Sequence, residues 1–302
     1  MSPGNVAVIT GGASGIGLAA ATRFAGLGMK LCIADIGEDR LAEAAARLAS
    51  VTKGGAADVM TATVDVSRFD DLAALETAVQ KRFGGTDILM NNAGIGPDSN
   101  SFGPLENWQR ILAVNLWGVI HGTQAFAPHM VERGRPGLII NTGSKQGITT
   151  PPGNPAYNVS KAGVKAQTEA LQHELRNIPG CRISAHLMIP GHVFTALTAR
   201  GRTEKPPGAW TAEQTVDFMI ARIEAGDFYI LCPDNDVPRP LDERRMLWAA
   251  GDIVANRPAL SRWHPDYAEA FAKFVKGEGS DAVPLSPGGR GWIDDAKRRR
   301  DG

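Results

Sequence analysis

The sequence predicts an α/β fold, a doubly wound parallel sheet of about seven strands with helices on both faces. Short apolar runs alternate with longer helix-like segments, and the first run leads through a glycine-rich turn into an Ala-rich helix. Strands that are apolar throughout are buried on both faces, which requires a parallel sheet covered by helices. Ligands of such sheets bind at the carboxyl ends of the strands. We expect strands at 5–10, 30–34, 60–64, 87–91, 137–142, 182–188 and 228–232.

The segments between these strands have the composition of helices. The longest of them, 105–132, is either two helices or one helix broken near Gly118 to Gly122. At 302 residues and 43% apolar content the chain can bury a full core, so we expect one main domain over residues 1–236. Helices are predicted at 18–27, 39–49, 69–82, 105–132 and 156–176.

Residues 237–302 form a predicted C-terminal extension, mainly helical, with a helix-like stretch at 241–256. The extension also contains several aromatic residues, which are not expected to face water. We therefore predict that the extension packs on the domain or on a neighbouring subunit. The glycine-rich and basic end predicts that the final ten to fifteen residues are mobile. The aromatic residues are Trp263, Tyr267, Phe271, Phe274 and Trp292.

Charge and cysteine usage exclude several classes of function. Lys plus Arg equals Asp plus Glu at 32 each, so no net field favours nucleic acid or an anionic membrane. The chain has no apolar run long enough to span a bilayer and no signal-peptide pattern, which predicts a cytoplasmic protein. Cys32, Cys181 and Cys232 lie in apolar, strand-like segments. We expect them to be buried, and we expect no disulfide and no metal site.

The turn after the first strand has the composition of a phosphate-binding element. Gly11, Gly15 and Gly17 follow the spacing T-G-x3-G-x-G between a strand and a helix. Glycines allow backbone N–H groups to approach a pyrophosphate, and the helix N-terminus supplies partial positive charge. The sequence therefore predicts a dinucleotide site here.

Asp35 closes the second strand, eighteen residues after Gly17. An acidic side chain there can accept hydrogen bonds from the adenosine ribose hydroxyls. A 2′-phosphate would meet like charge, at a cost of roughly 4 kcal/mol, near a thousandfold in affinity. Because Ile36 follows the acid, and Ala13 and Ser14 fill the glycine turn, we find no cation that would offset this repulsion. NAD is predicted over NADP; Asp35 could alternatively serve as a helix cap or turn residue.

Tyr157 and Lys161 lie four residues apart, and Ser144 lies thirteen positions upstream of Tyr157. A phenol and an ammonium at i and i+4 share one face of a helix. At about 6 Å and an effective dielectric near 20, their interaction is on the order of 3 kcal/mol, or roughly two pKa units of the phenol. Such a tyrosine can exchange protons near neutral pH. The alternative is a helix that carries this common pair by chance.

Together these motifs resemble the short-chain dehydrogenase/reductase family, in its single-domain form with T-G-x3-G-x-G and Y-x3-K motifs on a Rossmann-type fold. The resemblance covers roughly residues 5–232. The matching positions, in the order typical of the family, are Thr10 to Gly17, Asp65 with Val66, Asn91 to Gly94, Asn115, Ser144, Tyr157, Lys161, Pro190 with Gly191, and Thr195.

The resemblance implies a catalytic role for four residues. Tyr157 would be the general acid or base, Lys161 would also bind the nicotinamide ribose, and Ser144 would hold the substrate oxygen. Asn115 would position a water molecule or helix carbonyl that relays the proton, although it could instead be a helix-kink residue.

The resemblance also implies the cofactor contacts. Asp65 and Val66 would lie against the adenine, and Thr195 would hold the carboxamide or cap a helix. The complete expected set is Gly11, Ser14, Gly15, Ile16, Gly17, Asp35, Asp65, Val66, Asn92, Ala93, Gly94, Tyr157, Lys161, Pro190, Gly191, Val193 and Thr195.

Departures from the family pattern indicate substrate contacts. Relatives often carry small residues where this chain has Lys145 and Gln146, and a loop stiffened by three prolines follows at 147–155. Lys145 could contact an acidic substrate group or point to solvent. His192 could line the pocket or cap the next segment. Residues 192–210 would be a mobile lid over the substrate.

The predicted function is an NAD-dependent oxidoreductase that acts on a small or medium, largely apolar secondary alcohol or its ketone. The alternatives are an epimerase or lyase that uses NAD transiently, and a non-enzymatic NAD-binding sensor. Through the resemblance, we expect a homotetramer or dimer formed by the helices at 105–132 and 156–176.

Overall fold

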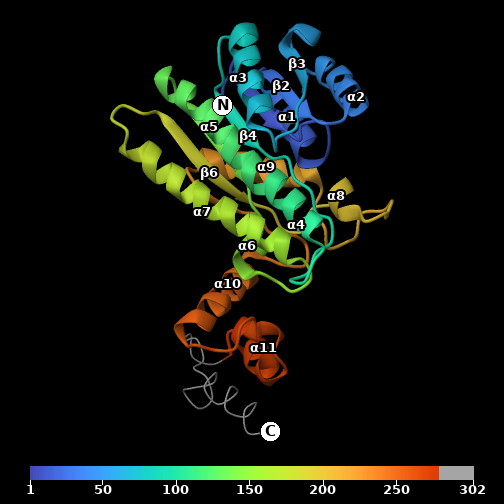
Figure 1. Cartoon of the computed structure of the whole chain (residues 1–302), viewed down its shortest axis with the longest axis vertical. Helices are drawn as coiled ribbons and strands as arrows, with labels where there is room; N and C mark the ends of the chain where they lie inside the picture. The colour runs from blue at the N-terminus through green and yellow to red at the C-terminus, as the bar shows by residue number, and fades with distance from the viewer. Residues whose placement is uncertain (279–302) are drawn as a thin grey trace.

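The computed structural model describes residues 1–278 and contains a seven-stranded, fully parallel sheet of order β3-β2-β1-β4-β5-β6-β7 (Figure 1). The predicted α/β fold is confirmed, and each observed strand overlaps its predicted range. Trp292 lies outside the described residues. The final ten to fifteen residues, which the sequence predicts to be mobile, lie outside them too. The strands are β1 (Val6–Thr10), β2 (Lys30–Asp35), β3 (Val59–Thr63), β4 (Ile88–Asn91), β5 (Gly137–Thr142), β6 (Ile183–Ile189) and β7 (Tyr229–Leu231).

Helices cover both faces of the sheet because successive strand residues point to opposite sides. On one face, Ala7 and Ile9 of β1 pack with α1, α2 and α9, and on the other Val6 and Val8 pack with α3, α5 and α7. Strand order reverses beside β1, which opens a crevice at the carboxyl ends of β1 and β4. The main helices are α1 (Gly15–Gly26), α2 (Glu38–Ala49), α3 (Phe69–Phe83), α4 (Leu105–Leu112), α5 (Gly118–Glu132), α7 (Pro155–Asn177) and α9 (Ala212–Glu224).

The long helical run at 105–132 is interrupted upstream of the predicted position. Helices α4 and α5 are joined by a π-helical turn, η2 (Ala113–Trp117), so the predicted alternative of two helices is confirmed, and the junction lies just before Gly118 and not within Gly118 to Gly122. Asn115 lies at the centre of this turn and bonds the backbone of Ile95. The wider turn lets this side chain reach the segment after β4, and such π-turns are frequent at functional sites.

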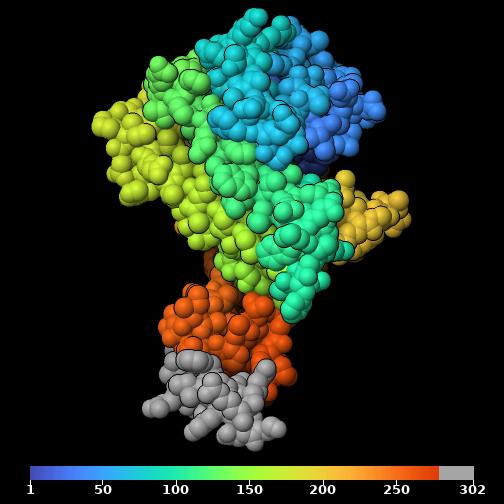
Figure 2. Space-filling view, viewed as in Figure 1, coloured from blue at the N-terminus to red at the C-terminus, as the bar shows by residue number. Residues whose placement is uncertain are grey.

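The C-terminal extension leaves the domain as α10 (Arg239–Val254), which packs on the short helix α6 (Gln146–Thr149) and then on α11 (Ala268–Lys276). Figures 1 and 2 show it as a lobe that projects from one end of the domain. Trp248, Tyr267 and Phe274 bury one another in a small core of their own. The Trp248 indole N–H donates to Ser261 Oγ at 2.8 Å. The extension approaches the domain at the start of α10 and at Leu260, which lines a cavity together with Pro151 and Asn158 of the domain.

Two further features bear on function. Within residues 1–278, none of the helices combines the length and the apolar composition that a membrane span requires. Cys32 and Cys232 are buried free thiols and Cys181 is partly buried. Nowhere in this described part of the chain do three or more His, Cys, Asp or Glu side chains gather as a metal site would require.

Candidate active site

A cavity of about 530 Å³ lies at the carboxyl ends of the strands. Residues of β2, β5 and α7, the turns after β1, β3 and β4, and the segment after β6 form its walls. All the expected cofactor residues line it except Gly17. The predicted residues in its wall are Gly11, Ser14, Gly15, Ile16, Asp35, Asp65, Val66, Asn92, Ala93, Gly94, Ser144, Tyr157, Lys161, Pro190, Gly191, Val193 and Thr195.

The glycine turn packs so closely against its neighbours that side chains at these positions would collide with the protein. A Cβ on Gly11 would lie 2.9 Å from Ala93 Cα, and one on Gly17 would collide with the Gly11 carbonyl oxygen. Gly15 has a φ of +51°, and its Cβ would lie 3.2 Å from Thr195 Cγ2. Helix α1 begins at Gly15 with no acidic residue in its first turn. The cradle therefore fits the pyrophosphate of a dinucleotide.

Asp35 lies at the end of β2 and accepts the backbone N–H of Ile36 at 2.9 Å and of Ala13 at 3.4 Å. Its Oδ1 also lies 3.2 Å from Arg40 Nη2, and Arg40 lines the cavity. The expectation that no cation stands near Asp35 was therefore wrong. Arg40 lies five residues after Asp35, in the first turn of α2, and its side chain reaches back to the end of β2.

Asn92 ties the strand ends together under the cavity. Its Nδ2 donates to Thr10 O at 3.2 Å and to Gly11 O at 3.4 Å, and its Oδ1 accepts from Thr142 Oγ1 at 3.3 Å. Asn92 therefore links the glycine turn to β5, which carries Ser144 at its end.

Tyr157, Lys161 and Ser144 meet at one end of the cavity. Helix α7 presents Tyr157 and Lys161 on one face, and its N-cap Asn154 accepts the backbone N–H of Tyr157 at 3.2 Å. Lys161 Nζ donates to Thr142 O at 2.7 Å and lies 5.7 Å from the centroid of the Tyr157 ring. The Ser144 hydroxyl lies near the phenol and lowers its pKa through hydrogen bonding. This geometry lets one hydroxyl hold an oxygen atom while the phenol exchanges its proton.

Burial, more than the lysine charge, sets the proton affinities in the ligand-free chain. Burial raises the pKa of Tyr157, and the Ser144 hydrogen bond lowers it by less. Burial also lowers the pKa of Lys161 to about 8. The expected depression of the Tyr157 pKa is thus wrong for the free chain, because desolvation disfavours the charged forms of both partners.

The Lys161 pKa gives a stability prediction. Because the folded pKa of about 8 lies below the ordinary 10.5, the unfolded chain holds this proton more tightly across that window, and stability rises with pH there. Relative to Lys161→Met, we expect wild type to gain about 2 kcal/mol of unfolding free energy between pH 7 and pH 9.5. Chemical denaturation at both pH values measures this, and Lys165→Met, one turn along α7 in an exposed pair with Glu169, is the control. No gain relative to Lys161→Met would contradict the lowered pKa.

Asn115 is fully buried and lies behind the cavity wall. Its Oδ1 accepts from Ile95 N at 2.8 Å, and its Nδ2 donates to Ile95 O at 2.9 Å and to Ser160 Oγ at 3.3 Å. A Cβ on Gly94 would lie 3.5 Å from Asn115 Oδ1 and 3.9 Å from Lys161 Nζ. Asn115 thus fixes the segment after β4 beside Lys161. It also lies in the π-turn, which is the helix kink that we gave as the alternative to a catalytic role for this residue.

Thr195 has the capping role and also lines the cavity, while its contact with the carboxamide stays a prediction. It caps the short helix α8 (Ala196–Ala199) in a capping box with Thr198, and it lines the cavity opposite Gly15. Thr198 Oγ1 donates to Val193 O, which holds this segment in a compact turn over the cavity.

The three residues predicted to contact substrate lie outside the cavity wall, and these predictions are corrected. Lys145 points neither into the cavity nor to solvent but into a buried ion pair with Asp234 and Asp242. Gln146 is exposed on α6, and the His192 side chain is exposed too. His192 contributes its backbone instead, accepting from Trp210 N at 2.9 Å.

Sequence reasoning missed the apolar wall beside Tyr157. A Cβ on Gly96 would lie 3.5 Å from Leu197 Cδ1 and 3.9 Å from Tyr157 Cδ2, so this wall stands next to the phenol. These residues carry no motif, and their only signal is their position directly after β4 and β6. Ala196, Leu197 and Thr198 belong to the segment at 192–210 that was expected to lie over the substrate. The further lining residues not foreseen include Arg40, Ser67, Ile95, Arg110, Ala113 and Val114.

Comparison with known proteins gives consistent matches. The model of the short chain dehydrogenase family matches residues 5–206. The chain is 31% identical over 263 residues to 1-deoxy-11-beta-hydroxypentalenate dehydrogenase of Streptomyces exfoliatus, across 85% of this chain and 93% of that protein. It is 39% identical over 168 residues to 3beta-hydroxysteroid dehydrogenase 2 of Eggerthella lenta, across 55% and 63%. A solved short chain dehydrogenase/reductase of Burkholderia phymatum, in complex with NAD, is similar with a TM-score of 0.75 and 32% identity, across 84% and 96%.

Proposed function

Because the chain belongs to the short-chain dehydrogenase/reductase family, and is therefore an oxidoreductase that acts on CH–OH groups with a nicotinamide cofactor, we propose that it oxidises an apolar alicyclic secondary alcohol with NAD, or reduces the ketone. The observation that carries this proposal is that Ser144, Tyr157 and Lys161 line the same cavity as the glycine-rich turn, with Lys161 Nζ 5.7 Å from the centroid of the Tyr157 ring.

The reaction needs one proton transfer between the substrate oxygen and the protein. When bound, the nicotinamide ring supplies C4 as hydride acceptor or donor, and its oxidised form carries positive charge. Ser144 holds the substrate oxygen by a hydrogen bond. Tyr157 takes the hydroxyl proton during oxidation and returns it during reduction. Lys161, held by Thr142 O, stabilises the phenolate by its charge and donates toward the nicotinamide ribose.

NAD is proposed over NADP because Asp35 lines the cavity with a carboxylate, at the end where we expect the adenosine ribose. Arg40 already pairs with that carboxylate at 3.2 Å. Its side chain is half-exposed, so solvent screens its charge, and it reduces the repulsion of a 2′-phosphate without reversing it. The choice of cofactor therefore depends on a balance between Asp35 and Arg40.

The substrate class follows from the wall beside Tyr157. Ile95, Val193, Ala196 and Leu197 give this end of the cavity an apolar lining, which favours a hydrocarbon frame around the reacting carbon. Two similar proteins carry the names of a hydroxypentalenate dehydrogenase and a hydroxysteroid dehydrogenase. An alicyclic secondary alcohol fits both the lining and these names.

The proposal is tested by following absorbance at 340 nm with NAD and with NADP across aliphatic, alicyclic, aryl and steroid secondary alcohols. We expect NADH formation to be fastest with the alicyclic and steroid members, and faster with NAD than with NADP. Turnover of the aliphatic or aryl alcohols alone would contradict the assigned substrate class, and a preference for NADP would contradict the role given to Asp35.

A homo-oligomer is also proposed. Trp117, at the start of α5, is 52% exposed, and Val159, on α7, is 47% exposed. These two helices are the ones expected to pair between subunits, and burying such residues favours association. A cytoplasmic location stays a prediction from the sequence.

A further inference from the structure

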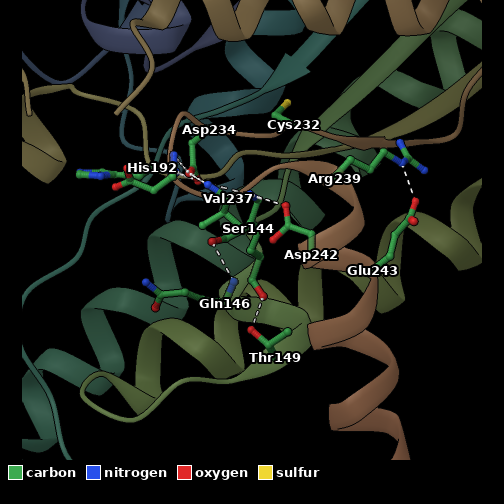
Figure 3. Close-up of polar contacts among 12 residues, drawn as sticks. Ser144, Gln146, Thr149, His192, Cys232, Asp234, Val237, Arg239, Asp242 and Glu243 are labelled. Atoms are coloured by element: carbon green, nitrogen blue, oxygen red, sulfur yellow. Dashed lines mark hydrogen bonds and ion pairs between the residues drawn. The ribbon is translucent and has the colours of Figure 1, made fainter. Parts of the chain in front are cut away.

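Lys145 belongs to a buried ionic cluster that joins three distant parts of the chain (Figure 3). Its Nζ lies 2.5 Å from Asp242 Oδ2 and 3.3 Å from Asp234 Oδ2. The side chains of Lys145, Asp234 and Asp242 are 15%, 5% and 4% exposed. Lys145 directly follows Ser144, Asp234 follows β7, and Asp242 lies in the first turn of α10. Desolvating three charges is costly, so the cluster needs a role other than stability alone.

Asp234 connects the cluster to the loop that lines the cavity. Its Oδ2 accepts His192 N at 3.0 Å, and its Oδ1 accepts Val237 N at 2.8 Å. A Cβ on Gly191 would collide with Asp234 Oδ2 and lie 2.8 Å from Lys145 Nζ. The cluster therefore packs directly against the backbone of the loop at 190–195, whose other side faces the cofactor cavity.

Lys145 connects the cluster to the turn that carries Ser144. Its N–H donates to Pro190 O at 3.4 Å, and its carbonyl accepts Ile148 N and Thr149 N, each at 3.1 Å. The backbone of Lys145 thus joins α6 to the cavity loop, while its side chain reaches α10. A shift of this residue would move the Ser144 hydroxyl relative to Tyr157.

We propose that Lys145, Asp234 and Asp242 are positioning residues, and that the first turn of α10 is part of the active-site architecture. The cluster holds the Ser144 turn and the loop at 190–195 in a fixed relation. The importance of that relation to catalysis rests on the proposed function, but the positioning itself is measurable without a substrate. The C-terminal extension is thereby coupled to the cofactor site through Asp242.

The test compares Asp242→Ala with Glu243→Ala in the full chain. Both remove a carboxylate from the beginning of α10, but Glu243 makes an exposed pair with Arg239 at 2.8 Å, so it is a matched control. Lys145 keeps Asp234 as a partner in both variants. We expect Asp242→Ala to raise amide hydrogen exchange in segments 143–149 and 190–198 by about tenfold, the equivalent of one lost charge-assisted contact. NAD affinity, measured by calorimetry, should fall by about three- to tenfold, and Glu243→Ala should stay within about twofold of wild type in both.

The outcomes separate this inference from the proposed function. If Asp242→Ala lowers only the melting temperature, while exchange in both segments and NAD affinity stay at wild-type values, the cluster is merely structural and the inference is overturned. If wild type oxidises no alcohol but the exchange difference appears, the proposed function fails and the positioning role stands. If Asp242→Ala does not fold, Asp242→Asn keeps the volume of the side chain, and the same two segments must still exchange faster than in Glu243→Ala.

Discussion

Replacing Tyr157 by Phe is expected to lower kcat for alcohol oxidation by about 10³ or more, because a positioned acid or base contributes roughly 10² to 10⁴. Only the phenolic O–H is lost, which is the group that would exchange the proton. The ring can stay packed against Gly96 and beneath Lys161, so NAD affinity should change by less than about threefold. Steady-state rates at 340 nm and calorimetric NAD binding measure the two effects.

Tyr229→Phe is the matched control for this variant. Its hydroxyl donates a hydrogen bond to Glu169 Oε1 at 2.6 Å, but on the surface of the domain. We expect its kcat to equal that of wild type. Should Tyr157→Phe keep a tenth or more of the wild-type rate, Tyr157 would not be the acid or base.

Replacing Asp35 by Asn is expected to raise the ratio of kcat/KM for NADP to that for NAD by roughly 10² to 10³. Removing the carboxylate eliminates a repulsion of roughly 4 kcal/mol with a 2′-phosphate. It also frees Arg40, now paired with Asp35 Oδ1, to bind that phosphate. Initial rates over a range of both cofactors give the ratio.

Two variants isolate the contribution of Arg40. In the Asp35→Asn background, Arg40→Ala should remove most of the gain with NADP and leave NAD kinetics nearly unchanged. Asp39→Asn, an exposed acid in the same helix, should not alter the ratio. An unchanged ratio in Asp35→Asn would mean that this residue does not face the ribose.

The fold and the cofactor cradle could be predicted because they depend on local patterns and on one rule of parallel sheets. Gly11, Asp35, Asn92 and Ser144 are far apart in the sequence, but each follows the carboxyl end of a strand, and all these ends meet at one edge. The spacing of Tyr157 and Lys161 on one helix placed both side chains on one face. These positions required no knowledge of tertiary packing.

The remaining features depend on contacts that no local pattern encodes. Lys145 and Asp242 are 97 residues apart, and their pairing depends on where α10 meets α6. Arg40 reaches Asp35 because of the angle at which α2 leaves β2. The proton affinity of Tyr157 was misjudged because a distance and a charge do not reveal burial, which raises its pKa in the free chain.

The most direct test of the central claim is hydride transfer from an alicyclic secondary alcohol that carries deuterium on its carbinol carbon. Wild type incubated with NAD should release reduced nucleotide one mass unit heavier than ordinary NADH, together with the ketone. If the NAD-bound protein is incubated with a panel of such alcohols and forms no NADH, or only unlabelled NADH, the account is contradicted. A transient use of NAD or a sensor would then be favoured.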